Sequence, residues 1–181
     1  MKTLALLFVC VGLACAEVAD SSANGFTVKT TLDIAAPPSG VYRKLVENIG
    51  DWWSPKHTFS GDAHHLSIDA KPMGCFCEKL EDGGAVRHME VVYLAPGRTL
   101  VFNGALGPLQ SLATTGSMTI TLAASGTGTK LAVSYAVAGY FSAGMNTWAV
   151  PVDSVIREQF TRLKNYVESG DPAGNREGKK P

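Results

Sequence analysis

The amino-acid sequence predicts an α+β fold in which a curved antiparallel sheet of about seven strands wraps around one long C-terminal helix. Residues 26–34 alternate between apolar and polar side chains, and strand-like segments separated by turn signals then continue to residue 140. An amphipathic helix over residues 151–168 follows these strands. Close strand spacing with short turns is typical of an antiparallel meander, which a terminal helix can cover on one face.

The first sixteen residues, MKTLALLFVCVGLACA, have the features of a secretory signal. Lys2 precedes an apolar run too short to remain as a membrane anchor, and Ala14 and Ala16 have the A-x-A spacing of a cleavage site. We therefore expect cleavage after Ala16, a secreted or periplasmic protein, and no stable membrane insertion. Two alternatives are a buried helix and acylation of Cys15 as in a bacterial lipoprotein, although Gly12 stands where leucine is usual.

Removal of this leader from the 181 residues leaves 165, enough for one domain with a sizeable core. Acidic and basic residues number sixteen each in the full chain, so no basic surface indicates nucleic acid as a partner. Only Cys75 and Cys77 lie beyond the leader, too few for a disulfide framework. The fold must therefore be stabilised by its hydrophobic core.

The N-terminal half of the predicted domain begins with a half-buried strand over FTVKTTLDI, residues 26–34. Residues 17–25 before it are expected to be flexible. Pro38 favours a helix start, and apolar residues then recur at helical spacing up to Gly50. The next stretch, DWWSPKHTF, is expected to be a short helical turn that runs into a loop.

Six further strands are predicted from HLSIDA, CFCEKL, AVRHMEVVYL, TLVFNGAL, SMTITLAA and TKLAVSYAV. The last two alternate strictly, so their inward faces are clear. The strand around His88 has no clear inward face, because Val91 and Val92 would point opposite ways and both phases contain polar residues. The glycine-rich GALGPL, residues 104–109, lacks the lysine and the strand-to-helix context of a phosphate loop, and is expected to be a turn or a flexible gate.

The terminal helix is the best-marked element. Pro151 stands at its start, an acidic residue lies in its first turn, and Gly170 follows its end. Its apolar residues form a single stripe: Val152, Ile156, Phe160, Leu163 and Val167. The tail over residues 169–181 is expected to be disordered, which leaves one folded domain over residues 26–168.

This order of elements, and several local strings, resemble the START-like or SRPBCC superfamily and its helix-grip fold. The strings are DIAAPPSGVYRKLVENIGDWWSP, GCFCEKL with GGAVRHMEVVYLAPGRTLVF, and GTKLAVSYAVAGY with VDSVIREQFTRLKNYVE, spanning roughly residues 26–168. The superfamily includes birch-pollen-allergen proteins, lipid-transfer START domains, polyketide cyclases and dehydrases, and a chaperone-ATPase-activator branch. Because it has no single catalytic signature, the resemblance implies the fold more firmly than the function.

The resemblance implies a deep apolar cavity between sheet and terminal helix that admits a lipid, polyketide, sterol or aromatic metabolite. In such folds the segment after the first helix borders the cavity mouth, which here is DWWSPKHTF. Its tryptophans would each offer apolar area and an indole N–H to an amphipathic ligand, although one could instead fill the core, and Trp148 could simply close the sheet edge. The expected ligand-binding residues are Trp52, Trp53, His57, Phe59, Phe102, Tyr135, Trp148, Ile156 and Phe160.

A metal site is an alternative interpretation of the same stretch. His57, Asp62, His64, His65 and Asp69 offer nitrogen and oxygen ligands, but their spacing matches no rigid metal motif such as H-E-x-x-H. Solvent-exposed loop histidines are the ordinary explanation of this pattern. We therefore expect neither a metal site nor a cofactor.

The remaining cysteines, Cys75 and Cys77, lie two positions apart on a predicted strand, so both face one side of the sheet. An extended strand would separate their Cα atoms by about 6.6 Å, near the upper limit for a disulfide. A bridge that puckers the strand and two small buried thiols therefore both remain open.

Three functional classes fit these patterns. The leading hypothesis is a non-enzymatic carrier or sensor of a small hydrophobic ligand. The alternative is a cavity enzyme of the cyclase, dehydrase or hydrolase type, in which His88, Glu90 and Tyr135 perform acid–base chemistry. His88 and Glu90 are expected to share a strand face, where they could instead pair with each other and with Arg87. A protein-interaction module is the third class, and export would remove a cytosolic chaperone as its partner.

Overall fold

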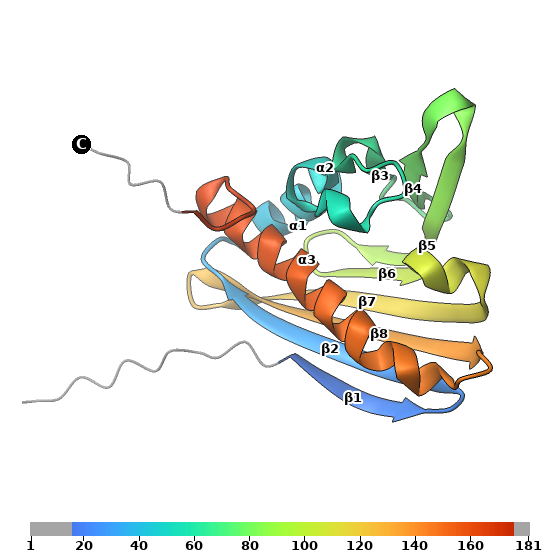
Figure 1. The fold of residues 1–181 in the computed structure, drawn as a ribbon. Coiled ribbons are helices and arrows are strands. Elements are labelled where there is room, and N and C mark those ends of the chain that lie inside the picture. Colours follow the sequence, from blue (N-terminus) through green and yellow to red (C-terminus); the bar gives the residue numbers. More distant parts are fainter. Residues whose placement is uncertain (1–15, 176–181) are drawn as a thin grey trace, which may run out of the picture.

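The computed structural model describes residues 16–175 and shows an open eight-stranded antiparallel sheet that curves around a long helix (Figure 1). The strand order is β1-β2-β8-β7-β6-β5-β4-β3. The strands are β1 (Ala16–Ser22), β2 (Gly25–Ile34), β3 (Leu66–Ile68), β4 (Cys75–Lys79), β5 (Ala85–Ala95), β6 (Thr99–Asn103), β7 (Ala113–Ser125) and β8 (Gly128–Tyr140).

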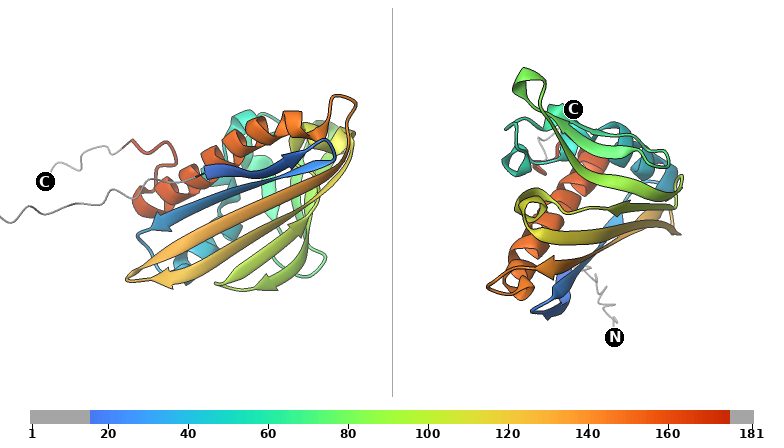
Figure 2. Two further views of the ribbon diagram at one scale, coloured as in Figure 1. Left: turned by 90° about the horizontal axis from the view of Figure 1, so that it is seen from below. Right: turned by 90° about the vertical axis from the view of Figure 1, so that its right-hand side faces the viewer.

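The helices lie on the concave side of the sheet and at one of its ends (Figure 2). The α-helices are α1 (Pro38–Glu47), α2 (Ile49–Trp52) and α3 (Ala149–Ser169). The 3-10 helices are η1 (Pro55–His57), η2 (Ala63–His65), η3 (Glu81–Gly83), η4 (Gly107–Ser111) and η5 (Met145–Trp148). Helix α3 crosses the sheet with the apolar stripe that its sequence predicts, and Gly170, at a φ of 82°, ends it in the left-handed conformation.

The centre of the sheet follows from strict alternation. Strands β7 and β8 form an uninterrupted hairpin from Ala113 opposite Tyr140 to Ser125 opposite Gly128, and β2 pairs with β8 along its whole length. Every second residue is buried over most of β2 and over the central parts of β7 and β8, and α3 packs mainly against β2 and β1. This regular part holds α3 in place and leaves the less regular strands β3–β6 to shape the other side of the core.

The N-terminal boundary differs from the expectation of a flexible segment over residues 17–25. Residues 16–22 form β1, which pairs antiparallel with β2 and makes the sheet eight strands wide rather than about seven. Strand β1 lies at the edge of the sheet and is held by backbone hydrogen bonds to β2. Such pairing does not require alternating apolar side chains, and the sequence AEVADSS has none. Residues 1–15 of the expected signal lie outside the described residues.

The expected disordered tail is also partly ordered. Ser169 still belongs to α3, and the carboxylate of Asp171 accepts hydrogen bonds from the backbone N–H groups of Ala173 and Asn175. Residues 176–181 lie outside the described residues. Within residues 16–175, no helix is long and apolar enough to cross a membrane.

Candidate ligand-binding pocket

An apolar pocket of about 400 Å³ lies at the end of the molecule where α3 begins. Its walls come from three segments: residues 53–59 with η1, residues 106–109 at the start of η4, and residues 148–156 over the first turns of α3. His88 on β5 completes the wall. The pocket therefore occupies one end of the helix–sheet interface, where the loops that join the sheet meet the helix.

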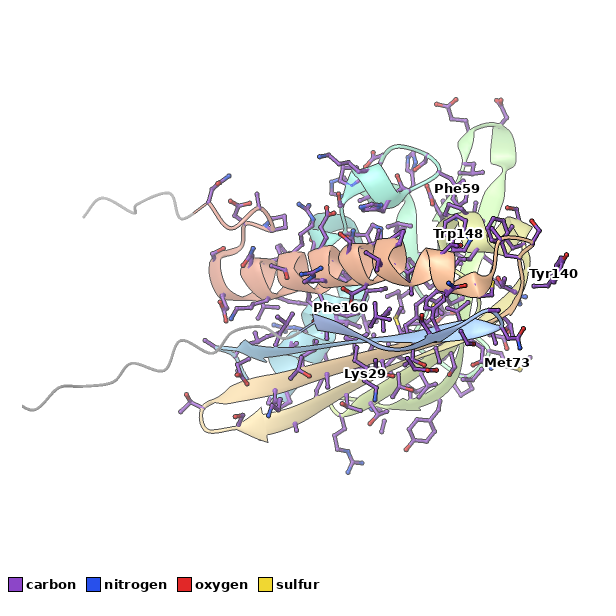
Figure 3. The ribbon with its side chains drawn as sticks, turned by 60° about the horizontal axis from the view of Figure 1, so that its bottom comes forward. Lys29, Phe59, Met73, Tyr140, Trp148 and Phe160 are labelled. Carbon is purple, nitrogen blue, oxygen red and sulfur yellow. A yellow bond between two sulfur atoms is a disulfide. The ribbon has the colours of Figure 1, made fainter. Side chains whose placement is uncertain are left out.

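Five of the nine residues expected to bind a ligand line this pocket: Trp53, His57, Phe59, Trp148 and Ile156. Figure 3 shows Phe59 and Trp148 near each other at this end of α3, while Phe160 lies farther along the helix. The other four are core residues, and three of them surround an inner void of about 20 Å³, room for roughly one water molecule: Trp52, Phe102 and Phe160. Side chains thus fill the core beneath the middle of α3 down to this small void, and the pocket of about 400 Å³ lies at the end where α3 begins.

The two adjacent tryptophans divide these roles between them. Trp52 is buried, packs against Phe160 and donates its indole N–H to the Lys44 carbonyl at 3.2 Å. Trp53 faces the pocket, but its indole N–H donates to the His57 carbonyl at 3.0 Å. Neither indole N–H is directed to a ligand, contrary to expectation, because the Trp52 N–H ties α2 back to α1 and the Trp53 N–H closes the turn through η1.

The wall of the pocket contains a buried histidine–carboxylate pair. His88 Nε2 lies 2.9 Å from the carboxylate of Glu78 on β4, and the two side chains are 4% and 0% exposed. The side-chain nitrogen of Gln110 approaches His88 Nδ1 at 3.3 Å. Since an amide nitrogen donates, Nδ1 accepts, and the Nε2–H donates to Glu78. Both ring nitrogens are therefore engaged, and it is the ring that contributes to the pocket wall.

Glu78 also anchors the rim of the pocket. Its carboxylate accepts the backbone N–H groups of Phe59 at 3.1 Å and Ser60 at 2.5 Å. Burial acts to raise the pKa of Glu78, but the hydrogen bonds from Ser60, Phe59 and His88 outweigh it and hold the pKa below its ordinary value. Burial lowers the pKa of His88 against the opposing influence of Glu78. The pair is thus a carboxylate beside a neutral imidazole.

The expectation that His88 and Glu90 share a strand face is wrong, because a β-bulge at His88 changes which side chains of β5 face the core. Met89 pairs with Phe76 and Arg87 pairs with Cys77, so His88 is an extra residue in β5. His88 and Met89 are both buried, whereas Glu90 is 35% exposed and binds the Arg87 guanidinium at 2.9 Å. The alternative of a surface ion pair with Arg87 therefore holds for Glu90 and not for His88.

Tyr135 is buried away from the pocket, contrary to both roles expected of it. Its hydroxyl donates to the Gly104 carbonyl at 3.3 Å and accepts the Leu106 N–H at 3.1 Å. Burial raises its pKa to about 12, against the opposing effect of the Leu106 hydrogen bond. Gly104, at a φ of 150°, leaves no space for a Cβ against the backbone of β5. Tyr135 therefore fixes the loop that carries Leu106 into the pocket wall. The segment GALGPL, expected to be a turn or a flexible gate, is thus held in place by this hydroxyl.

The histidine-rich stretch after the tryptophans does not converge. His57 lies 3.1 Å from the Glu158 carboxylate on α3, whereas Asp62 accepts the His64 N–H at the start of η2. In the described part of the chain, no group of three or more His, Cys, Asp or Glu side chains is placed to hold a metal ion. The His57–Glu158 pair instead joins the rim segment to α3.

Trp148, expected either to bind a ligand or to close the sheet edge, is part of an aromatic pair. Trp148 meets Phe141 in a T-shaped contact with ring centroids 5.9 Å apart. Tyr140 beside it is exposed and projects from the end of the molecule (Figure 3). Trp148 thus closes the end of the sheet and lines the pocket at the same time.

Cys75 and Cys77 form a disulfide, which decides between the two alternatives left by the sequence. Their Cα atoms are 5.3 Å apart, closer than in an extended strand, as expected for a puckered one. Both side chains are half-buried, and they alternate along β4 with the buried Phe76 and Glu78. The bridge therefore lies on the outer face of the sheet, behind the His88–Glu78 pair.

Comparison with solved structures shows the same fold at low sequence identity. CalU16 from Micromonospora echinospora aligns with a TM-score of 0.58 and 14% identity over 88% of this chain and 86% of that chain. Ara h 8.0201 aligns with a TM-score of 0.56 and 18% identity, over 79% of this chain and 97% of that chain. DynU16, a putative protein in the dynemicin biosynthetic locus, aligns with a TM-score of 0.57 and 17% identity, over 81% of this chain and 49% of that chain. The present chain therefore spans about half the length of DynU16. No protein-family model and no curated protein matches the sequence.

These likenesses show that the chain has the helix-grip fold that the resemblance implied. Several contributors to the site were not among the expected residues, and Glu78, Gln110 and Val155 are examples. Glu78 shares the phase of Phe76 in the alternation of CFCEKL, which was a readable signal for burial. Gln110 and Val155 carried no signal of their own, because their places depend on how η4 and α3 meet.

Proposed function

We propose that this protein is an exported carrier of a small hydrophobic or amphipathic ligand held at the start of α3. The observation that carries the proposal is the apolar pocket of about 400 Å³ between η1, η4 and α3. This volume lies within the range of about 300–1,000 Å³ typical of small-molecule sites, which are mostly apolar with a few polar groups. Lys56 and His57 supply such groups at the rim, where the polar end of a guest would lie.

The experiment that tests carriage has two parts. Native mass spectrometry of protein purified from its producing organism should show a retained small molecule. Apolar ligands added to stripped protein should then raise its melting temperature, because a ligand at one hundred times its Kd stabilises the native state by about 2.7 kcal/mol. For a domain of this size that corresponds to roughly 5–10 °C.

Two valine variants on α3 make the test specific to the pocket. Val155→Phe places a larger side chain inside the pocket and should abolish the ligand-induced gain in melting temperature. Val150→Phe, on the exposed face of the same helix, makes the same chemical change outside the pocket and should retain the gain. A gain that survives Val155→Phe in a folded protein would exclude this pocket as the site.

Export is the part of the proposal that rests on the leader sequence. Cleavage after Ala16 would remove only the first residue of β1 and keep the pairing of β1 with β2 from Glu17 onward. The mature protein should therefore begin at Glu17 when its mass is measured from culture medium or periplasm. An intact leader on protein recovered from the cytoplasm would contradict this part and leave the pocket unaffected.

A cavity enzyme is the second candidate, favoured by the His88 ring in the pocket wall and the Glu78 carboxylate that orients it. Glu90 and Tyr135 take no part, so the chemistry would fall to His88 alone. Nδ1 would have to exchange its Gln110 contact for a substrate proton. His88→Gln should weaken but not abolish ligand-induced stabilisation in a carrier, because the rest of the apolar wall remains, and should abolish turnover in an enzyme.

A further inference from the structure

The disulfide on the outer face shortens the strand next to the pocket. An extended strand would separate the Cα atoms of residues 75 and 77 by about 6.6 Å, and the bridge holds them at 5.3 Å. Strand β5 carries its extra residue, His88, opposite this segment. A shortened β4 beside a lengthened β5 bends the sheet locally, which is the usual effect of a bulge.

The bridge connects to the pocket through one residue. Glu78 follows Cys77 directly, and its carboxylate holds His88 together with the backbone of Phe59 and Ser60. His88 and Phe59 both line the pocket, and their rings lie 5.9 Å apart. Any change in the length of β4 at Cys77 therefore moves the acceptor that positions two parts of the pocket wall.

We infer that Cys75–Cys77 is a thiol–disulfide exchange site for a dithiol reductant, and that its state sets the affinity of the pocket; this rests on the proposed function. Both cysteines are half-buried on the outer face, so a thiolate can approach them. Arg87 lies opposite Cys77 in the register and Glu90 lies opposite Cys75, so the bridge has the exposed Arg87–Glu90 ion pair on the neighbouring strand.

The exchange is balanced by the dithiol alone. Its first thiolate attacks one sulfur of the bridge, forms a mixed disulfide and releases the other cysteine as a thiolate. The second thiol of the reductant, as its thiolate, then attacks the reductant sulfur in the mixed disulfide. This closes the reductant's own disulfide and releases the second cysteine. Two electrons and two protons pass from the dithiol, which becomes a disulfide, to Cys75 and Cys77, which become thiols.

Reduction lets β4 return to the extended spacing, so Glu78 shifts against the bulge at His88 and its hold on Phe59 is loosened. The reduced protein should bind N-phenyl-1-naphthylamine, a neutral apolar fluorophore, at least about fivefold more weakly, the lower range of coupling between two sites. Alkylation and mass measurement after dithiothreitol treatment should show two new thiols in the folded protein. The Cys75→Ser/Cys77→Ser variant should bind like the reduced protein and should not respond to dithiothreitol.

Equal affinity in both states, with the two thiols verified, would overturn the inference, and so would a bridge that dithiothreitol opens only in urea. If the fluorophore binds neither state, the proposed function fails instead, and the NMR signals of the His88 ring provide the independent measurement. These signals, assigned with His88→Gln, should shift on reduction. Signals that stay unchanged would refute the link between bridge and pocket wall.

Discussion

Replacing Glu78 with glutamine tests whether one buried carboxylate holds the pocket wall together. Three donors converge on it: the backbone N–H groups of Phe59 and Ser60, and Nε2 of His88. Glutamine keeps one acceptor oxygen and turns an NH₂ group toward at least one of these donors. Hydrogen bonds to charged groups contribute about 1.5–3 kcal/mol each, so losing one and weakening the others should cost about 2–4 kcal/mol.

The matched control is Glu90→Gln on the neighbouring strand. Glu90 pairs with Arg87 at the same 2.9 Å separation, but the two side chains are 35% and 67% exposed. Exposed ion pairs contribute about 0.2–1 kcal/mol, so this variant should lose less than about 1 kcal/mol. Urea unfolding at pH 7, followed by tryptophan fluorescence, gives both free energies of unfolding. Equal costs for the two variants would refute the assignment of Glu78 as the anchor.

Two further predictions concern pH and the loop after β6. Because the pKa of His88 is lowered, the unfolded chain binds its proton first, so stability should begin to fall as pH drops below about 6.5. The lowered pKa of Glu78 makes its contribution present above about 4.3 and lost as pH falls further through its folded pKa. The urea midpoint measured against pH should show both stages, and a His88→Gln variant that keeps the first would contradict this assignment. Tyr135→Phe removes the hydroxyl that bonds Gly104 and Leu106, and should lower the free energy of unfolding by about 1–3 kcal/mol in the same assay. An unchanged urea midpoint would mean that the loop does not depend on this hydroxyl.

The regular half of the molecule was predictable because local pattern and tertiary position agree there. The apolar stripe of α3 and the alternation of β7 and β8 each predict which side faces the core, and the structure confirms these faces. Strand β1 was missed because an edge strand needs only backbone pairing. The resemblance supplied what these patterns could not, namely that helix and sheet pack as a helix-grip fold.

The irregular half could not be predicted from alternation, because β5 breaks its own phase twice. Register shifts leave His88 and Met89 both buried, and Val92 and Tyr93 both exposed. A bulge is a relation between two strands, so nothing within one strand announces it. For this reason the sequence paired His88 with Glu90, although its true partner is Glu78 on the adjacent strand.

The inner end of the pocket is a partition made of Trp53 and Leu106, which border the pocket on one side and the small void in the core on the other. In the proposed carrier, single side chains rather than the backbone would therefore limit the length of the largest ligand. A shorter side chain at position 106 would thin this partition without moving a strand. The size of ligand that the proposed site admits could thus change through substitutions at individual positions while the fold stays the same.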